Sequence, residues 1–489
     1  MKIISSPVLF ILSLLVFGAG VYYFWDYSID DAFVTFRYAE NFAGGHGLRF
    51  NLGDKAVEGY SNFLWLLLLS ALYGIGLPTY LTAKVLGVLF FALSGWLWTK
   101  IEKELSFRFP VPAGALFLLA PVTAFWAVSG LELGLHTFLI SGAILLLLRY
   151  SRLAWIPLAL LVLSRPEGVV ISLAIATAGG LMSRDSKTDK RFGSLSGIVV
   201  VLLVMAALVA FRMAVFGHPL PNTYYAKAES STAGWLELGK FALYMLPLTL
   251  LLLLVLYRSL RNGEFRRWEI LFALIFLLQA AVSVRASAVM NLHFRYLIPV
   301  LPLFLVAALK GWELLRPGWK KPVLAIMFIS VFSPVIAVTE SVAREEEIMA
   351  AQHDLIAKLK ATSENTRISI TDAGRIPYYT DRYFYDIWGL NSEDIAHKGF
   401  NPTTEYFRFP DYFIFVGHIA NEKLFLRFGK EELIYQNRGF KECYPLVSVS
   451  APPGADISRP GYYYLTFARN QRAVDSLLTV AGKKYLIGQ

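Results

Sequence analysis

The stretch IDDAFVTFRYAENFAGGHGLRF, residues 29–50, directly follows the first apolar segment of the chain. It begins with two adjacent carboxylates, Asp30 and Asp31, although one aspartate is enough to cap a helix. Aromatic and polar positions then alternate until Gly44 and Gly45, which are a helix stop signal. We therefore expect a short amphipathic helix, capped by Asp30 or Asp31, whose dipole lowers the pKa of a carboxylate there.

The composition indicates a membrane protein. Of the 489 residues, 56% are hydrophobic and only 17% are charged, whereas soluble domains carry about 25% charged residues. Runs such as ALFLLAPVTAFWAV and LSGIVVVLLVMAALVAF approach the roughly 20 apolar residues that span a bilayer. The first apolar segment ends in VYYFWD without a small-residue cleavage site, so we interpret it as a retained anchor.

The formal net charge of +10 does not indicate a nucleic-acid partner. The Lys and Arg residues lie mostly in short loops between apolar segments, where positive charge marks the cytoplasmic side of a membrane. The single cysteine, Cys443, excludes an intramolecular disulfide and a cysteine-based metal cluster.

The hydropathy and loop charges predict about eleven spans and one helix, at 61–76, embedded from the outer face. The segment 153–164 is too short to cross alone, so we expect a hairpin with 167–182 whose apex is SRPEG. The expected spans are 7–24, 80–99, 110–128, 131–148, 153–164, 167–182, 195–216, 240–257, 268–284, 295–315 and 322–339. This threading predicts a multi-pass membrane protein with short basic loops on the cytoplasmic side.

The character of the chain changes near residue 341. REEEIMAAQHDLIAKLK is typical of a soluble amphipathic helix, and RISIT, DYFIFVG and YYYLTFA are typical of short strands. We expect residues 1–340 to form the transmembrane catalytic domain. Residues 341–489 are expected to form a soluble α/β domain, which lies outside the cytoplasm after an odd number of crossings.

Ionisable side chains gather in the predicted outer loops, where charges close to a membrane often mark a site or a pathway. A transporter needs polar groups that reach both faces, so this one-sided distribution favours an enzyme. Besides Asp30 and Asp31, the candidate site residues are Arg37, Glu58, Tyr60, Asn62, Glu132, Arg165, Glu167, Asn222, Tyr224, Tyr225, Lys227, His293, Arg295 and Tyr296.

Two roles follow from their chemistry. An ionised carboxylate at Asp30 or Asp31 is suited to general-base work on a hydroxyl. Arginine and lysine side chains bind phosphate groups, which makes four residues candidates for a lipid-linked phosphate. These are Arg37, Arg165, Lys227 and Arg295.

Structural roles are the alternative for the same residues. Arg165 and Glu167 can pair only with each other inside the hairpin, and His293 and Arg295 can be anchors at a span end. PLPNTYYAK, which contains Lys227, can be an interfacial aromatic belt. His46, His136 and His218 are too scattered for a histidine-based metal site. The sequence assigns no cofactor, and an acidic divalent-metal site that includes Asp30, Asp31 or Glu132 stays open.

Several motifs together resemble a family of bacterial membrane glycosyltransferases. They are DDAFVTFRYAENFAGGHGLRFN with VEGYSNFLW, SRPEG, PLPNTYYAK, HFRYLIPVLP and DAGRIPYYTDRYFYDIWGLN, in this order. The family includes the mycobacterial terminal β-(1→2)-arabinofuranosyltransferase of cell-wall arabinan and belongs to the GT-C fold class. The WWD motif of oligosaccharyltransferases is absent, which argues against transfer to asparagine.

The resemblance implies a mainly helical GT-C fold, a polyprenyl-phosphate sugar as donor and an envelope glycan or glycolipid as acceptor. It also implies that Asp30 and Asp31 are catalytic. From their own chemistry and position, we expect six residues to lie around the donor: Arg37, Arg165, Glu167, Lys227, His293 and Arg295. A lipid-linked glycan transporter or flippase is the alternative. A phosphoglycosyl or phosphoethanolamine transferase needs a nucleophile and metal constellation that the C-terminal part does not obviously supply.

Overall fold

The computed structural model describes residues 6–149, 151–182, 190–226, 233–263, 267–285 and 292–487. The chain forms two compact units. The helical unit comprises Met1–Ile29, Ser61–Pro219 and Glu229–Val342, and the sheet unit comprises Asp30–Tyr60, Leu220–Ala228 and Ala343–Gln489. The sheet unit thus includes two segments, 30–60 and 220–228, that the sequence analysis placed with the membrane part.

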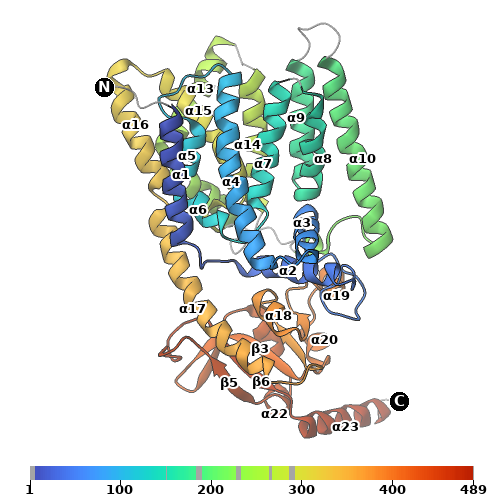
Figure 1. Cartoon of the computed structure of the whole chain (residues 1–489). Coiled ribbons are helices and arrows are strands. Elements are labelled where there is room, and N and C mark those ends of the chain that lie inside the picture. The colour runs from blue at the N-terminus through green and yellow to red at the C-terminus, as the bar shows by residue number, and fades with distance from the viewer. Residues whose placement is uncertain are drawn as a thin grey trace. The chain divides into compact units, whose positions relative to one another are not determined.

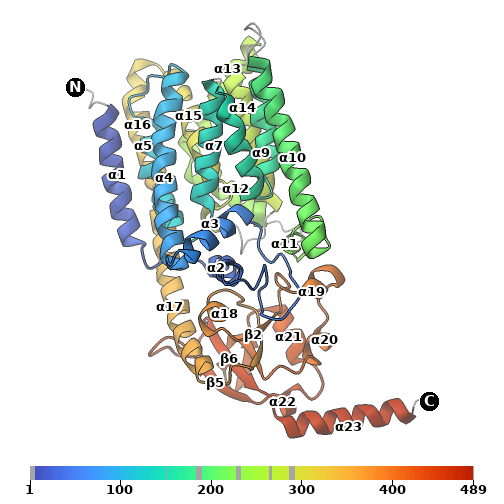
Figure 2. The ribbon, with the colours of Figure 1, turned by 45° about the vertical axis from the view of Figure 1, so that its right-hand side comes forward.

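The helical unit is a set of long apolar helices. Neighbours in sequence pack against one another from α7 to α10, and α4 packs on α7 (Figures 1 and 2). Its elements are α1 (Ser6–Tyr23), α3 (Phe63–Gly74), α4 (Thr79–Glu104), α5 (Ala113–Leu119), α6 (Pro121–Ala127), α7 (Leu133–Leu148), η1 (Arg152–Ala154), α8 (Trp155–Ser164), α9 (Gly168–Met182), α10 (Lys190–Phe216), α12 (Ala233–Tyr244), α13 (Leu246–Asn262), α14 (Arg267–Arg285), η3 (Leu292–Phe294), η4 (Ile298–Val300), α15 (Leu301–Glu313), α16 (Pro317–Phe332) and the first part of α17 (Val335–Lys360).

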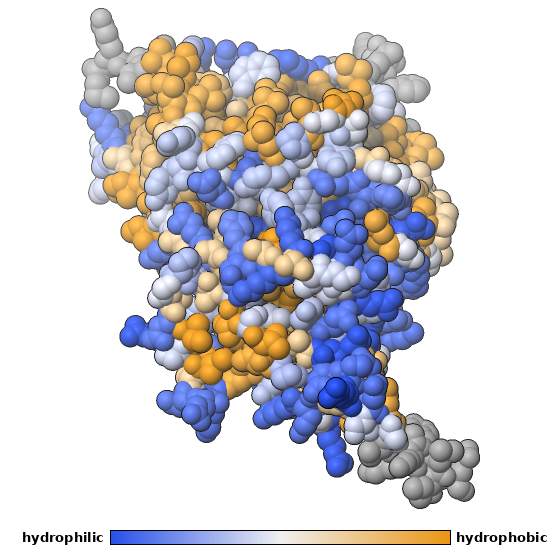
Figure 3. All heavy atoms as spheres, turned by 60° about the horizontal axis from the view of Figure 1, so that its bottom comes forward, coloured by the Kyte–Doolittle hydropathy of each residue, from blue (hydrophilic) through white to orange (hydrophobic). Residues whose placement is uncertain are grey.

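Several of these helices suit a bilayer. Among the described residues, four helices have the length and composition to cross a membrane, and α12 with α13, bent by 91°, would make a fifth. The four are Thr79–Glu104, Ser196–Phe216, Trp268–Arg285 and Pro317–Lys360. Large side chains such as Leu15, Leu203 and Leu277 are exposed, and apolar residues gather over the bundle in the space-filling view (Figure 3). Such a surface is favourable in lipid.

Other expected spans are shorter or interrupted. The segment 110–128 breaks between α5 and α6, because Pro121 has no N–H to continue the helical bonding. The segment 295–315 becomes a regular helix only at Leu301, after the short turns η3 and η4. The expected hairpin of α8 and α9 is present, and its break lies at Arg165–Glu167.

One lysine lies inside the bundle, within the expected span 80–99. Lys84 of α4 is fully buried. Its ammonium group donates to the carbonyls of Trp25 and Tyr27, the latter at 2.9 Å, and lies 4.7 Å from the ring centroid of Tyr80. Lys84 therefore provides hydrogen bonds to two backbone carbonyls of the segment that follows α1.

The sheet unit contains a mixed sheet in the order β2-β1-β3-β6-β5, with β4 paired to β3. β1 is parallel to β2 and β3, and the other pairs are antiparallel. The strands are β1 (Arg367–Ile370), β2 (Tyr383–Asp386), β3 (Tyr412–Ala420), β4 (Lys423–Leu426), β5 (Leu446–Ser450) and β6 (Tyr463–Ala468). The helices are α2 (Asp30–Ala43), α11 (Asn222–Ala226), the second part of α17, α18 (Arg375–Thr380), α19 (Glu393–Lys398), α20 (Pro402–Tyr406), α21 (Gly429–Tyr435), α22 (Phe440–Cys443) and α23 (Gln471–Ile487).

The expected strands RISIT, DYFIFVG and YYYLTFA correspond to β1, β3 and β6. Their inward side chains form an aromatic core that includes Phe413, Phe415 and Phe467. Strands β2, β4 and β5, which the sequence analysis did not expect, complete the sheet.

Helix α2 occupies the expected range and has the expected amphipathic sequence, but its central part is buried. All residues from Ala32 to Ala39 are buried, so the helix has no open polar face. Neither Asp30 nor Asp31 precedes the helix as a cap, since both lie in its first turn.

Two glycines let α4 and α5 approach each other closely. A Cβ atom on Gly114 would overlap the carbonyl oxygen of Gly95, and the reverse contact is also tight. Small residues at such crossings allow the backbone-to-backbone packing on which membrane helices depend.

We therefore expect Gly114→Ala to lower the thermal midpoint of the detergent-solubilised protein. Overpacking typically costs about 1–3 kcal/mol, which outweighs the gain of up to about 1 kcal/mol from replacing a helical glycine. Gly142→Ala in α7 is the matched control, because nothing lies within 4 Å of its new Cβ. Equal midpoints for both variants would contradict this account of the crossing.

Candidate functional site

Asp30, at the start of α2, is held by the segment that opens α18. Its Oδ1 accepts the backbone N–H of Arg375 at 2.9 Å and the side-chain amide of Gln352 at 3.4 Å. Gly374 makes this approach possible, because a Cβ there would overlap the carbonyl and carboxylate oxygens of Asp30. The sequence DAGR, residues 372–375, thus brings the sheet unit's own backbone to the candidate base.

A second carboxylate, Asp372, lies in the same cluster. It accepts the hydroxyl of Tyr462 at 2.9 and 2.8 Å and the hydroxyl of Tyr464 at 2.6 Å. The amide of Gln352 also donates to the Tyr464 oxygen at 2.9 Å. Hydrogen bonds therefore connect Asp30 to Asp372 through Gln352 and Tyr464, and we call this group with Tyr462 the acid–tyrosine cluster.

Burial dominates the electrostatics of this cluster. It raises the pKa of Asp30, although Arg375 and its backbone N–H act in the opposite direction. It also raises the pKa of Asp372 to about 7, with a further contribution from the charge of Asp30. Glu345 accepts from the Arg375 guanidinium at 3.2 Å beside this cluster.

The expectation that the helix dipole lowers the pKa of this carboxylate was therefore wrong for Asp30. Loss of water around a buried charge outweighs the partial charge at a helix end. Asp31 is half-buried in the same turn, and its charge also raises the pKa of Asp30. A carboxylate with a raised pKa, once ionised, is a stronger base than an ordinary aspartate.

The guanidinium group of Arg37 is bonded to backbone carbonyls of the protein itself. Its buried guanidinium donates to the carbonyls of Phe50 at 2.7 Å, of Pro377, and of Arg382 at 2.9 Å. These contacts join three separate segments of the sheet unit. We therefore do not assign Arg37 to a donor phosphate.

Four more candidates, Glu58, Asn222, Tyr224 and Tyr225, belong to a second assembly in the sheet unit. The side chain of Asn222 donates to the carbonyls of Gly389 and Leu390 at 2.9 and 2.8 Å. Its backbone N–H donates to the carbonyl of Glu58 at 3.1 Å. Asn222 therefore fastens α11 to both neighbouring loops.

The aromatic candidates surround this assembly. The ring centroids of Tyr225 and His397 are 4.1 Å apart, and those of Tyr60 and Tyr38 are 5.0 Å apart. The side chain of Tyr224 is exposed. Lys227, the cation of the same motif, lies outside the described residues.

The helical unit brings together a different set around the α8–α9 break. Arg165 contacts the Glu132 carboxylate and donates from Nε to Glu167 at 2.6 Å. Asn62 donates to the second oxygen of Glu132 at 2.7 Å. All four side chains are buried. The cation thus contacts two carboxylates, so Arg165 and Glu167 do not pair only with each other: Glu132 is a second partner of Arg165.

Tyr296, Arg295 and His293 lie on the segment before α15. The Tyr296 ring centroid is 5.1 Å from the Arg165 guanidinium and 5.9 Å from that of Arg295. His293 adopts a left-handed backbone with φ 43°, shares a hydrogen bond of 2.6 Å with the Ser341 hydroxyl and accepts the Trp126 indole N–H through its carbonyl. His293 is therefore a fixed anchor within this unit.

The sequence analysis quoted the DAGR stretch and the YYY run but assigned none of their residues to the site. Two signals were present. Period-two alternation in a strand puts Tyr462 and Tyr464 on one face, and Asp372 directly follows a strand. Across the described residues, no three His, Cys, Asp or Glu side chains lie together as metal ligands would.

Solved structures resemble the chain over nearly its whole length. ArnT from Cupriavidus metallidurans in the apo state has a TM-score of 0.58 at 13% identity, covering 96% of this chain and 98% of ArnT. The same protein bound to undecaprenyl phosphate gives 0.58 at 13%, covering 94% and 97%. The Archaeoglobus fulgidus oligosaccharyltransferase tethered with an acceptor peptide gives 0.53 at 9%, covering 95% and 88%.

These likenesses define the fold. The chain has the mainly helical GT-C-type fold that the sequence resemblance implied, with a small C-terminal sheet. Residues 341–472 match a family model described as a domain of unknown function (DUF8728). No curated protein matches the chain.

We expect Arg165→Ala to destabilise the helical unit strongly. Removing one partner of a buried ion pair leaves uncompensated charge and costs about 3–5 kcal/mol; here two carboxylates would be left. Arg149→Ala is the control, because its pair with Glu104 at 2.8 Å is largely exposed and is expected to be worth at most about 1 kcal/mol. Thermal midpoints in detergent measure both, and equal values would return Arg165 to the donor-binding candidates.

Proposed function

We propose that this protein is a polyprenyl-phosphate-sugar-dependent glycosyltransferase of the bacterial inner membrane. It moves a sugar from the lipid-linked donor to a hydroxyl of an envelope glycan or glycolipid at the outer face, where the C-terminal domain lies. The observation that carries this proposal is the fold likeness to ArnT, which was also solved with undecaprenyl phosphate and matches over almost both full chains. The sequence resemblance points the same way and favours an arabinofuranosyltransferase-like reaction.

In the proposed reaction, Asp30 accepts the proton of the acceptor hydroxyl. The hydroxyl oxygen attacks the anomeric carbon, and polyprenyl phosphate leaves with the bonding electrons. A phosphate is already a good leaving group once cations stabilise it, so no general acid is required. Arg295 and Lys227 are the candidates for this contact, since Arg165 is held between Glu132 and Glu167.

The acid–tyrosine cluster supports the assignment of Asp30 over Asp31. The backbone N–H of Arg375 fixes one oxygen of the Asp30 carboxylate. Desolvation raises its pKa towards the range in which a general base works best near neutral pH. A lipid-linked glycan transporter needs no such base, so substitution of Asp30 separates the two functions.

Asp30→Asn and Asp31→Asn test the acid pair directly. Asparagine keeps the shape and polarity but accepts no proton, so we expect at least one variant to lose a factor of about 10² or more in turnover. The larger loss should belong to Asp30. The assay is transfer from a synthetic polyprenyl-phosphate sugar in detergent, with and without EDTA.

Near-normal turnover in both asparagine variants would make the pair structural, with the base to be sought at Glu58, Glu132 or Glu167. Activity lost in both variants and also on chelation would instead assign the pair to a divalent metal.

The pH dependence tests the coupling of Asp30 with Asp372. The base must be ionised, so kcat/KM should rise with pH through the raised pKa of the pair. Asp372→Asn removes a neighbouring negative charge, lowers the pKa of Asp30 and should shift this rise to lower pH. Asp354→Asn, an exposed position on α17, is the control. A profile from about pH 5 to about pH 9 that is identical in both variants would refute the coupling.

A further inference from the structure

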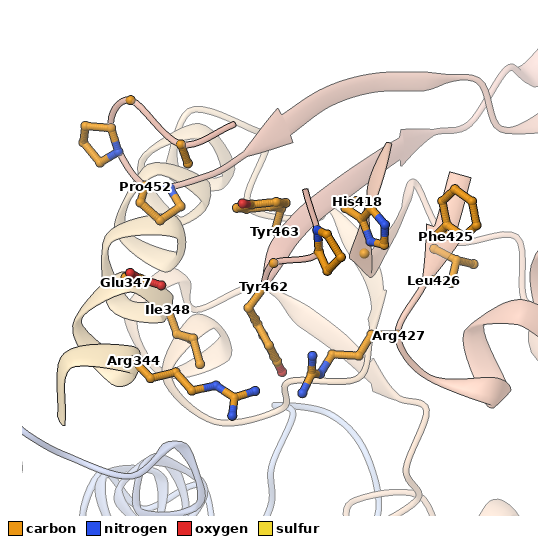
Figure 4. A pocket seen from close by; sticks show the side chains of 16 residues that line it. Arg344, Glu347, Ile348, His418, Phe425, Leu426, Arg427, Pro452, Tyr462 and Tyr463 are labelled. Atoms are coloured by element: carbon orange, nitrogen blue, oxygen red, sulfur yellow. The ribbon is translucent and has the colours of Figure 1, made fainter. Parts of the chain in front are cut away.

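The sheet unit contains a pocket of about 780 Å³ that the proposed reaction does not use. It lies between α17, the β3–β4 hairpin and the loop of residues 452–461 (Figure 4). Its volume is within the range of about 300–1,000 Å³ that is typical of small-molecule sites.

Aromatic side chains form much of its wall. His418 and Phe425 are paired across β3 and β4, and their rings stack with centroids 5.0 Å apart at an interplanar angle of 10°. Tyr462 and Tyr463 enter from the start of β6 (Figure 4). Flat rings of this kind pack well against the C–H faces of a sugar, while their polar edges stay available for hydrogen bonds.

The loop over the pocket is fixed in place. Ile419 of β3 donates its N–H to the carbonyl of Ile457 at 3.0 Å, and the Tyr463 hydroxyl donates to the carbonyl of Asp456 at 3.2 Å. Gly461 passes so close to the Tyr463 ring that a Cβ would overlap it. A preformed pocket of this kind loses little conformational entropy when a ligand binds.

Two guanidinium groups of exposed arginines converge on the wall of the pocket. Arg344 from α17 and Arg427 from the end of β4 both point to the hydroxyl end of Tyr462 (Figure 4). The Arg427 guanidinium lies 5.2 Å from the Tyr462 ring centroid. Glu347, the one carboxylate among the lining residues, lies apart from this point in the same view. Two like charges that converge in a cavity favour an anionic ligand.

We propose that this pocket binds an anionic sugar unit, carrying a phosphate or a carboxylate group, of the acceptor. The guanidinium groups of Arg344 and Arg427 bind the anionic group through paired N–H donors, and the ring faces of Tyr463 and His418 hold the sugar. Only the role of this sugar as acceptor rests on the proposed function; the binding chemistry itself does not.

Tyr462 gives the pocket a connection to the candidate base. Its ring lines the pocket, and its hydroxyl donates to Asp372 in the acid–tyrosine cluster. A ligand that contacts Tyr462 therefore lies one side chain away from the carboxylate that is coupled to Asp30.

Saturation-transfer-difference NMR on the full-length protein in nanodiscs tests the proposal with glucose 1-phosphate as probe. We expect signals from its sugar-ring protons, and weaker binding of glucose. Arg427→Gln and Arg344→Gln should each lower the affinity at least about tenfold, the loss of one charge-assisted contact. Arg459→Gln is the matched control, because its exposed side chain pairs with Asp456 outside the lining.

Unchanged binding in both lining variants, with thermal midpoints equal to the wild type, would overturn the proposal. Competition by inorganic phosphate as strong as by glucose 1-phosphate would reduce the pocket to a phosphate site and refute sugar recognition. Displacement of the probe by undecaprenyl phosphate would assign the pocket to the donor. Binding that persists in Asp30→Asn while transfer is lost supports both proposals, and binding without any transferase activity in the wild type would refute the function alone.

Discussion

The bond from the backbone N–H of Arg375 to the carboxylate of Asp30 is the constraint on which the candidate site depends. It spans 345 residues of sequence, and it forms only because residue 374 is a glycine. The same stretch supplies Asp372, two residues earlier, and the guanidinium that contacts Glu345 and Gln352. One short turn therefore fixes the position of the candidate base, its acidic neighbour and their principal counter-charge.

The charged residues around Arg165 and those of the acid–tyrosine cluster differ in how their charges are stabilised. In the helical unit, Arg165 lies between Glu132 and Glu167, so the ionised forms stabilise one another. In the acid–tyrosine cluster, Asp30 and Asp372 are near each other and burial opposes their ionisation. A stable ion pair suits a scaffold, whereas carboxylates whose pKa is raised by burial suit chemistry. This contrast is the physical reason for assigning catalysis to the sheet unit's acids.

Much of the fold follows from the sequence because its signals are local. Apolar runs mark α4, α7 and α10, and short runs rich in β-branched and aromatic residues mark β1, β3 and β6. The burial of α2 on every side could not be foreseen, since it depends on segments hundreds of residues away. For the site, the two adjacent aspartates identify Asp30 as a candidate. The direction of its pKa shift could not be predicted, because it depends on burial by distant segments. The roles of Arg37 and Arg165 were likewise hidden, because a cation bonded to carbonyls or carboxylates looks the same in sequence as a free one.

The division of the sheet unit into three stretches of chain affects how the protein can be made. Residues 30–60 leave the ribosome early, but the DAGR turn and the strands that complete their environment follow several hundred residues later. Contacts of such long sequence separation form slowly and only after synthesis is nearly finished. The early segment must therefore stay unpaired while the intervening helices insert. A fragment limited to the matched residues 341–472 would also lack α2. The surface that α2 covers in the full chain would then be exposed, and the fragment would be prone to aggregation.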